Sequence, residues 1–247
     1  MSSVGRCASC PPTDPRHQVR VAAWGRAQGV WEDEVMDSLE RAEHAYQAAM
    51  FAGETDGAAE ALRDLGGNGP EYDLARGKLR HCANIAERRQ DTEELACFER
   101  AETAFAKCGD SRGAGEALFW QGCYHQVLAD DDEIARPLFE RALELSKQAG
   151  DALMKSYSLR HLGISCHMAK NLDAAERLLQ ESTRLRRAIG FEAGVAANLV
   201  GLAFIALDRG DREQAQIRAQ EAERTARGCG AHAVVSWARQ ASEATRR

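Results

Sequence analysis

Apolar residues recur along the chain at steps of three and four, which is the spacing of a helix with one buried face. The pattern is clearest from Ile134 to Ala149, from Leu172 to Ile189 and from Ala215 to Ala226. Alanine, glutamate, arginine and leucine are abundant, and runs of β-branched residues are scarce. This composition favours helix over strand. The pattern therefore predicts an all-α protein.

The helical pattern repeats with a period of about forty residues. Gly109, Gly150, Gly190 and Gly230 follow one another at spacings of 41, 40 and 40 residues, and the sequence Phe-Glu-Arg-Ala occurs at 98–101 and again at 139–142. Each period contains two helical segments joined by a short polar turn. The glycine ends the second segment, where a left-handed residue is favoured. Repetition of this kind predicts stacked helical hairpins.

The repeat divides the chain into five hairpins and a last helix. The predicted hairpins are 31–52 with 57–66, 71–89 with 93–108, 112–129 with 132–149, 151–169 with 172–189, and 192–209 with 212–228, and the last helix is 231–246. A further helix is expected at 15–28. We expect a flexible tail over 1–14, N-terminal helices with an irregular first repeat over 15–69, regular repeats over 70–230, and a capping helix over 231–247.

Acidic residues mark the start of the second helix in several hairpins. The spacing of a capping box is found in Asp91 with Glu94, Asp130 with Glu133, and Asp211 with Gln214. Pro137 conflicts with this pattern because it lies inside the helix predicted from 132 and has no N–H to donate. That helix must therefore start late or bend at the proline.

Helix pairs with small residues at fixed places resemble tetratricopeptide repeats. The resemblance covers residues 70–230 and is best from 112. In each of three hairpins it rests on residues of the first helix followed by small or apolar residues further along. These are Leu118 and Gly122 followed by Ala135, Phe139 and Ala142; Leu159, Leu162 and Gly163 followed by Ala175, Leu179 and Ser182; and Leu199, Leu202 and Ala203 followed by Gly210, Ala215 and Ala222. The period exceeds the usual length of about 34 residues, as in the longer-helix variety of bacterial regulators and signalling ATPases. The resemblance implies an α-α superhelix of about five hairpins plus a C-terminal capping helix.

The resemblance also implies a concave face that is lined by the first helix of each pair. The residues it places there are Phe119, Cys123, Gln126, Tyr157, Arg160, Ile164, His167, Val200, Phe204 and Leu207. This mixed aromatic and apolar set would suit a docked peptide or helix. The repeated lysine and asparagine of the family's carboxylate-binding variant are missing, which argues against a binder of chaperone tails. The structural alternative is that several of these residues only pack against neighbouring repeats.

Charge and hydropathy exclude several classes of function. The net charge is −6 and no basic stripe dominates, so we expect no nucleic-acid partner. The short basic run Arg184, Arg186 and Arg187 is expected to be a solvated helix end. No apolar run approaches the ~18 to 20 residues of a membrane span, and the first residues do not resemble a signal peptide. We therefore expect a cytoplasmic protein, and the oligomeric state stays open.

Cysteine and histidine residues leave metal sites open as alternatives. Cys7 and Cys10 with His17 supply three of the four ligands of a structural zinc site. Within the predicted helices lie His81, Cys82, Cys123, His125, His161, Cys166 and His167. Their separations along single helices do not place two ligands on one face, although ligands from adjacent repeats could converge.

Three functions follow from these observations. The first is a non-catalytic scaffold or adaptor that binds a protein or peptide on its concave face and needs no cofactor. The second is a regulatory protein that senses a small ligand or a signal peptide. The third is a metal- or haem-dependent enzyme that uses the inner histidines and cysteines. No phosphate-binding loop, nucleophile elbow or zinc-protease motif supports catalysis.

Overall fold

The computed structural model describes residues 37–246, and within that range the chain is helical without strands. The elements in chain order are α2 (Ser38–Gln47), η1 (Ala48–Ala52), α3 (Asp56–Asp64), α4 (Pro70–Asn84), α5 (Thr92–Cys108), α6 (Ser111–Cys123), η2 (Tyr124–Leu128), α7 (Asp132–Ala149), α8 (Ala152–Met168), α9 (Leu172–Ala188), α10 (Glu192–Asp208), α11 (Arg212–Gly228) and α12 (His232–Ala244). The elements η1 and η2 are single π-helical turns that continue α2 and α6. The tail expected over 1–14 and the helix expected at 15–28 lie outside the described residues.

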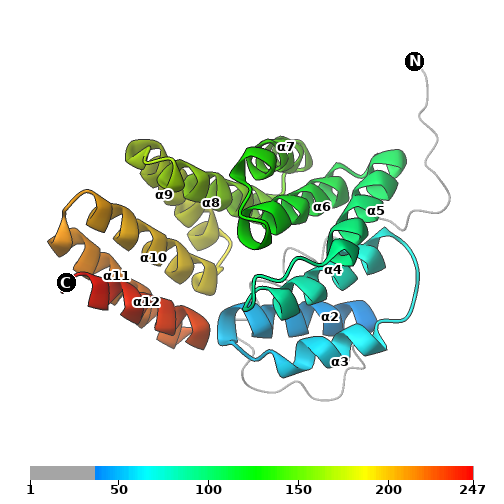
Figure 1. Cartoon of the computed structure of the whole chain (residues 1–247), viewed down its shortest axis with the longest axis horizontal. Coiled ribbons are helices and arrows are strands. Elements are labelled where there is room, and N and C mark those ends of the chain that lie inside the picture. The colour runs from blue at the N-terminus through cyan, green and yellow to red at the C-terminus, as the bar shows by residue number, and fades with distance from the viewer. Residues whose placement is uncertain (1–36, 247) are drawn as a thin grey trace.

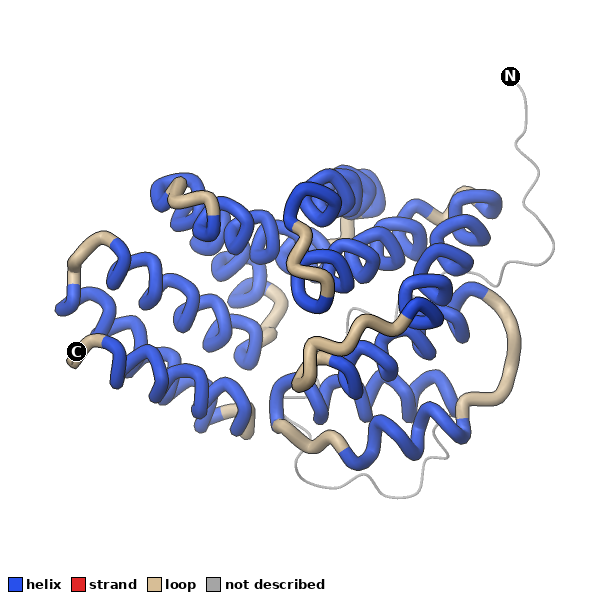
Figure 2. The backbone as a smooth tube through the Cα atoms, viewed as in Figure 1, coloured by secondary structure: helices blue, strands red, loops and turns tan. Residues whose placement is uncertain are grey.

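Consecutive helices form hairpins that stack in chain order (Figure 1). The hairpins are α2–η1 with α3, α4 with α5, α6–η2 with α7, α8 with α9, and α10 with α11, followed by α12. Successive hairpins pack through α5 on α6, α7 on α8, and α9 on α10. Figure 2 shows the short loops that join them. The all-α superhelix predicted from the forty-residue period is confirmed.

Side chains at the turns fix where the helices begin. The Asp131 carboxylate accepts from the backbone N–H of Ile134 at 3.1 Å, and Asp211 accepts from Gln214 at 2.9 Å. The cap of α7 is therefore Asp131 and not Asp130, which lies in the turn with a positive φ of 57°. Pro137 lies inside α7, which begins at Asp132, so the helix does not start late. Because proline has no N–H, the backbone carbonyl four residues before it receives no helical hydrogen bond. Pro137 lies on the exposed side of α7, so water can reach that carbonyl.

Glycine has two different roles in the stack. Gly109 and Gly150 end α5 and α7 with φ values of 72° and 66°, the left-handed conformation that closes a helix. Gly122 instead allows two helices to approach closely. A β-carbon at Gly122 would lie 2.6 Å from the ring of Phe139 in α7. The small residue expected halfway along this first helix is thus required by the packing.

The even-numbered helices form an inner layer. Contacts run from α2 to α4, α6, α8, α10 and α12 in turn, while α3, α5, α7, α9 and α11 lie outside them. The buried residues form two clusters. One lies in the N-terminal half around Phe98, Trp120 and Phe139, and the other lies in the C-terminal half around Leu199 and Ile205.

The two ends of the stack touch each other. The turn η1 contacts α12, and the side chain of Phe51 belongs to the C-terminal cluster. In Figure 1 the N-terminal end of α12 meets the end of α2. The superhelix is therefore closed by its own first hairpin, a contact that the resemblance to a curved stack with a concave face did not imply.

No helix in the range 37–246 combines the length and the apolar character that a bilayer crossing requires.

Candidate functional site

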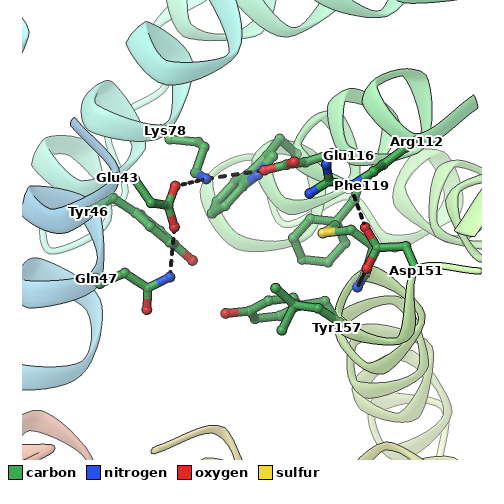
Figure 3. Close-up of a pocket in the computed structure, with 12 residues that line it drawn as sticks. Glu43, Tyr46, Gln47, Lys78, Arg112, Glu116, Phe119, Asp151 and Tyr157 are labelled. Carbon is green, nitrogen blue, oxygen red and sulfur yellow. Dashed lines mark hydrogen bonds and ion pairs between the residues drawn. The ribbon is translucent and has the colours of Figure 1, made fainter. Parts of the chain in front are cut away.

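Charged residues from the first three inner helices meet inside the superhelix (Figure 3). The Lys78 ammonium of α4 donates to Glu43 of α2 at 2.6 Å and to Glu116 of α6 at 3.1 Å. It also lies 4.6 Å from the centre of the Tyr46 ring. Burial disfavours the charge on Lys78, but the two carboxylates outweigh burial and raise its pKa. Burial likewise opposes ionisation of Glu43, yet the nearby ammonium lowers the pKa of that carboxyl.

These charges line a small cavity between α2, α4, α6 and α8. On the opposite wall Arg112 donates to Asp151 at 2.9 Å, and the Tyr157 ring closes the lower side (Figure 3). The cavity volume is about 20 Å³. That is room for about one water molecule, and it is far below the roughly 300 Å³ at which small-molecule sites begin. This cavity is therefore too small to hold a metabolite.

The ten predicted concave residues divide into two groups. Phe119, Cys123, Gln126 and Val200 are buried. Phe119 packs between repeats, with its ring centre 5.7 Å from that of Phe139 and 5.5 Å from that of Tyr157. For these four buried residues the structural alternative holds, namely that they pack inside the protein and do not face a partner. The other group is partly exposed and consists of Tyr157, Arg160, Ile164, His167, Phe204 and Leu207.

The partly exposed group lies on two adjacent inner helices, α8 and α10. Arg160 of α8 donates to the Ala197 carbonyl of α10 at 2.9 Å. At the other end of α8 the His167 ring nitrogen Nε2 lies 2.9 Å from Asp208 Oδ2 of α10. These contacts hold the two helices side by side. The structure adds Met168, which is 52% exposed, and its place one turn after Ile164 is the signal that could have identified it.

The histidines and cysteines of the inner helices do not gather at one place. Cys123 and His161 come together across two repeats, with 3.9 Å between Sγ and Nε2. His81 instead pairs with buried Glu94 at 2.7 Å. Burial, reinforced by the charge of Arg160, lowers the pKa of His161 well below its usual value.

Across residues 37–246 no three His, Cys, Asp or Glu side chains are placed to hold a metal ion. The zinc hypothesis concerns Cys7, Cys10 and His17, which lie outside the described residues, so it stays a prediction.

Arg186 was assigned to the wrong environment by the sequence pattern. It was expected on a solvated helix end, but its side chain is 1% exposed. The guanidinium lies between α8 and α10 and donates to the Gly194 carbonyl at 2.8 Å. Its position one turn after buried Ser182 and two turns after Leu179 was the available signal, because those residues share one face of α9.

Stacked helix pairs with a close glycine contact between their two helices define a helical-repeat protein of the superhelical class. Residues 111–188, which span α6 to α9, match the tetratricopeptide repeat family. The match shows tetratricopeptide repeats over these residues, in agreement with the resemblance that the forty-residue period and the small residues indicated. No curated protein sequence matches the chain.

Among solved structures, the fold is similar to that of a Signal Transduction ATPase with Numerous Domains (STAND) protein with a tetratricopeptide repeat sensor, from Pyrococcus horikoshii. The TM-score is 0.55 and the sequence identity is 15%. The match covers 85% of this chain but only 34% of that protein. At this identity the likeness concerns the fold, and this chain corresponds to about a third of the longer protein.

Proposed function

We propose that this protein is a non-catalytic binding module that takes up a peptide, or a segment of a protein partner, along the inner helices α8 and α10. Tetratricopeptide repeats are scaffolds of a kind suited to protein interaction or sensing, and function within such a fold depends on its site. The observation that carries the proposal is the partly exposed apolar stripe of Ile164, Met168, Phe204 and Leu207. These residues belong to the inner helices α8 and α10, the face on which the resemblance to tetratricopeptide repeats implies that a partner binds.

The chemistry of the stripe favours a peptide over a small metabolite. Ile164 and Met168 lie one turn apart on α8, and Phe204 and Leu207 lie one turn apart on α10, so the four side chains can contact a series of apolar side chains. Polar groups flank them, with Arg160 at one end and the His167–Asp208 pair at the other. The interior cavity of about 20 Å³ is too small for a metabolite in the closed form.

Site-specific photo-crosslinking tests this proposal. A benzophenone amino acid would replace Ile164 or Phe204, and the matched control would carry it at Ile217, which is 46% exposed on the outer helix α11. We expect crosslinks to a defined partner from the inner positions, and weaker capture when Arg160→Ala and His167→Ala are added. Equal crosslinking from Ile217, or none from the inner positions, would refute binding at this face.

A sensor is the second candidate, and the closed superhelix favours it. Phe51 ties the first hairpin to the C-terminal cluster, so a ligand that weakened this contact would let the two ends separate. Separation of the ends would be a conformational signal to an effector, and the similar STAND protein carries its repeats as a sensor. Hydrogen exchange with the captured partner distinguishes the two candidates. In a sensor the backbone amide hydrogens of η1 and α12 should exchange faster with solvent when the partner binds. In a rigid scaffold their exchange rates should not rise.

A further inference from the structure

The small cavity inside the superhelix has a buried acceptor in its wall that receives no hydrogen bond. Gln47 of α2 lines this cavity and is 5% exposed. Its amide nitrogen donates to Glu43 at 2.8 Å, while its oxygen Oε1 has no hydrogen-bond partner among the described residues. Figure 3 shows Gln47 beside Glu43 at the cavity. A buried acceptor is costly without a donor, so the cavity is suited to a small molecule or ion that carries N–H or O–H groups.

The lining of the cavity carries more negative than positive charge. In the described part of the chain the charged side chains that line it are three carboxylates, Glu43, Glu116 and Asp151, and two cations, Lys78 and Arg112, which gives a formal sum of −1. Lys78 is shared between Glu43 and Glu116, whereas Arg112 contacts Asp151. Burial opposes ionisation of Glu43, yet Lys78 lowers the pKa of this carboxyl, so it is charged at neutral pH. Because buried charges are normally balanced, this lining favours a cation over a neutral molecule.

We propose that this cavity is a binding site for one ammonium ion, with Gln47 Oε1 as an acceptor of its hydrogen bonds. The volume of about 20 Å³ holds a ligand of about the size of one water molecule, and an ammonium ion is close to that size and far smaller than an organic metabolite. The ion donates to Gln47 and supplies the single positive charge that balances the lining. A water molecule also donates to Gln47 but leaves the charge unbalanced.

Aromatic rings make the cavity more suitable for ammonium than for a metal ion. The rings that line it belong to Tyr46, Phe119, Trp120 and Tyr157, and the face of an aromatic ring attracts a cation. The Lys78 ammonium group already uses this attraction, since it lies 4.6 Å from the centre of the Tyr46 ring. Calcium and magnesium ions take about six or more oxygen ligands, whereas within residues 37–246 no three His, Cys, Asp or Glu side chains are placed to hold a metal ion. The cation that fits is therefore one held by hydrogen bonds and ring faces.

The cavity is connected to solvent. Glu43 and Arg112 both line it and are both partly exposed, so an ion can enter between side chains that do not belong to the apolar core. Arg186 packs on the Tyr157 ring, with 4.8 Å between its guanidinium and the ring centre, but does not line the cavity. Ammonium binding should therefore be reversible in the folded protein.

Ammonium chloride labelled with nitrogen-15 tests the proposal on the purified, unlabelled full chain. In mildly acidic buffer we expect an ammonium NMR signal that shifts saturably with protein concentration, or a separate signal of the bound ion. Ammonium chloride should also raise the urea midpoint more than equal concentrations of sodium or potassium chloride, because a ligand that binds only the folded chain stabilises it. Absence of a saturable signal, or equal effects of the three salts, would mean that the cavity holds water only. A larger effect of potassium would equally overturn the assignment to ammonium.

Substitutions assign the binding to this cavity. Gln47→Met removes the acceptor at similar volume and should weaken ammonium binding by about tenfold or more, the usual effect of losing a hydrogen bond to a charged group. Gln180→Met is the matched control, because Gln180 also donates to a glutamate four residues earlier, Glu176 at 3.0 Å, but is exposed on α9. It should bind like the wild type. Equal affinity of these two variants would overturn the proposal.

A second variant keeps the test decisive if circular dichroism shows that Gln47→Met does not fold. Glu43→Gln, at a partly exposed position, brings the formal charge of the lining to zero and should also weaken ammonium binding. Unchanged binding in Glu43→Gln would show that the charge of the lining does not hold the ion. The experiment contains no peptide partner, so its result is independent of the crosslinking test of the proposed function.

Discussion

The ring of Phe51 in η1 packs edge to face against that of Phe191, the residue that precedes α10. Their centres are 5.3 Å apart and their planes lie at 88°. Both side chains are buried in the C-terminal cluster. This contact connects the first hairpin of the stack to its fifth, so it holds the superhelix in its closed form.

Phe51→Ala should loosen this closure. Removing a buried phenylalanine costs about 3–5 kcal/mol of unfolding free energy, and urea denaturation would measure that loss. Amides in 38–52 should also exchange faster with solvent because the hairpin loses its contact with the far end. Ile134→Ala, at a position 48% exposed on α7, is the control and should change stability by less than 1 kcal/mol. Equal behaviour of the two variants would mean that Phe51 does not hold the ends together.

The closure could not be predicted from the sequence, whereas the repeats could. The terminal glycines and the polar turns are signals within one hairpin, and the period needs only a comparison of neighbouring hairpins in the sequence. The cap of α7 was placed one residue early because Asp130 and Asp131 offer the same chemistry. The contact of Phe51 with Phe191 depends instead on the accumulated curvature of five hairpins, which no local pattern encodes.

The candidate site was predicted only in part for a related reason. The family resemblance identified the inner helices, and Arg160, Ile164 and His167 lie on the partly exposed side of α8. Phe119 was expected on the exposed inner face, but it is buried in the same cluster as its neighbour Trp120. The neighbouring repeats cover this side chain, and the sequence of one helix does not show that. Arg186 was missed because a charged residue late in a helix is usually solvated. Its burial depends on packing against α10.

Gly122→Ala and Gly57→Ala should have opposite effects on stability. At Gly122 the new methyl group would lie 2.6 Å from the fully buried Phe139 ring, and overpacking of this kind costs about 1–3 kcal/mol. At Gly57 in α3 the methyl group would meet nothing within 4 Å, so the helix should gain about 0.5–1 kcal/mol from the lower backbone entropy of the unfolded chain. Urea denaturation of both variants gives the comparison. A loss at Gly57 as large as that at Gly122 would contradict the close approach of α6 and α7.

Lys78→Met should destabilise the protein at neutral pH. The substitution leaves the carboxylates of Glu43 and Glu116 facing each other without the ammonium that both contact. Removing one partner of a buried ion pair costs about 3–5 kcal/mol. The triple variant with Glu43→Gln and Glu116→Gln has no such repulsion and should recover most of the loss. If the triple variant is no more stable than Lys78→Met, as measured in urea, the charge network does not account for the effect.

His161 should make the protein less stable in mild acid. Burial, with the charges of Arg160 and Arg186, holds the pKa of His161 well below its usual value in the folded state. Below about pH 6.5 the unfolded chain therefore takes up a proton at this residue that the folded chain does not. The unfolding free energy should fall by up to about 1.4 kcal/mol for each pH unit below that point, until the folded pKa is reached.

The pH range and a second histidine separate this effect from other titrations. The carboxyl groups with lowered pKa, such as Glu43 and Asp208, lose their contribution only near and below their ordinary values of about 4, so they do not act between pH 6.5 and 5. His161→Gln should flatten the pH dependence of urea midpoints in that interval. Burial also lowers the pKa of the less enclosed His125, so His125→Gln should remove a smaller part of the slope. An unchanged slope in His161→Gln would show that this histidine is protonated in the folded protein.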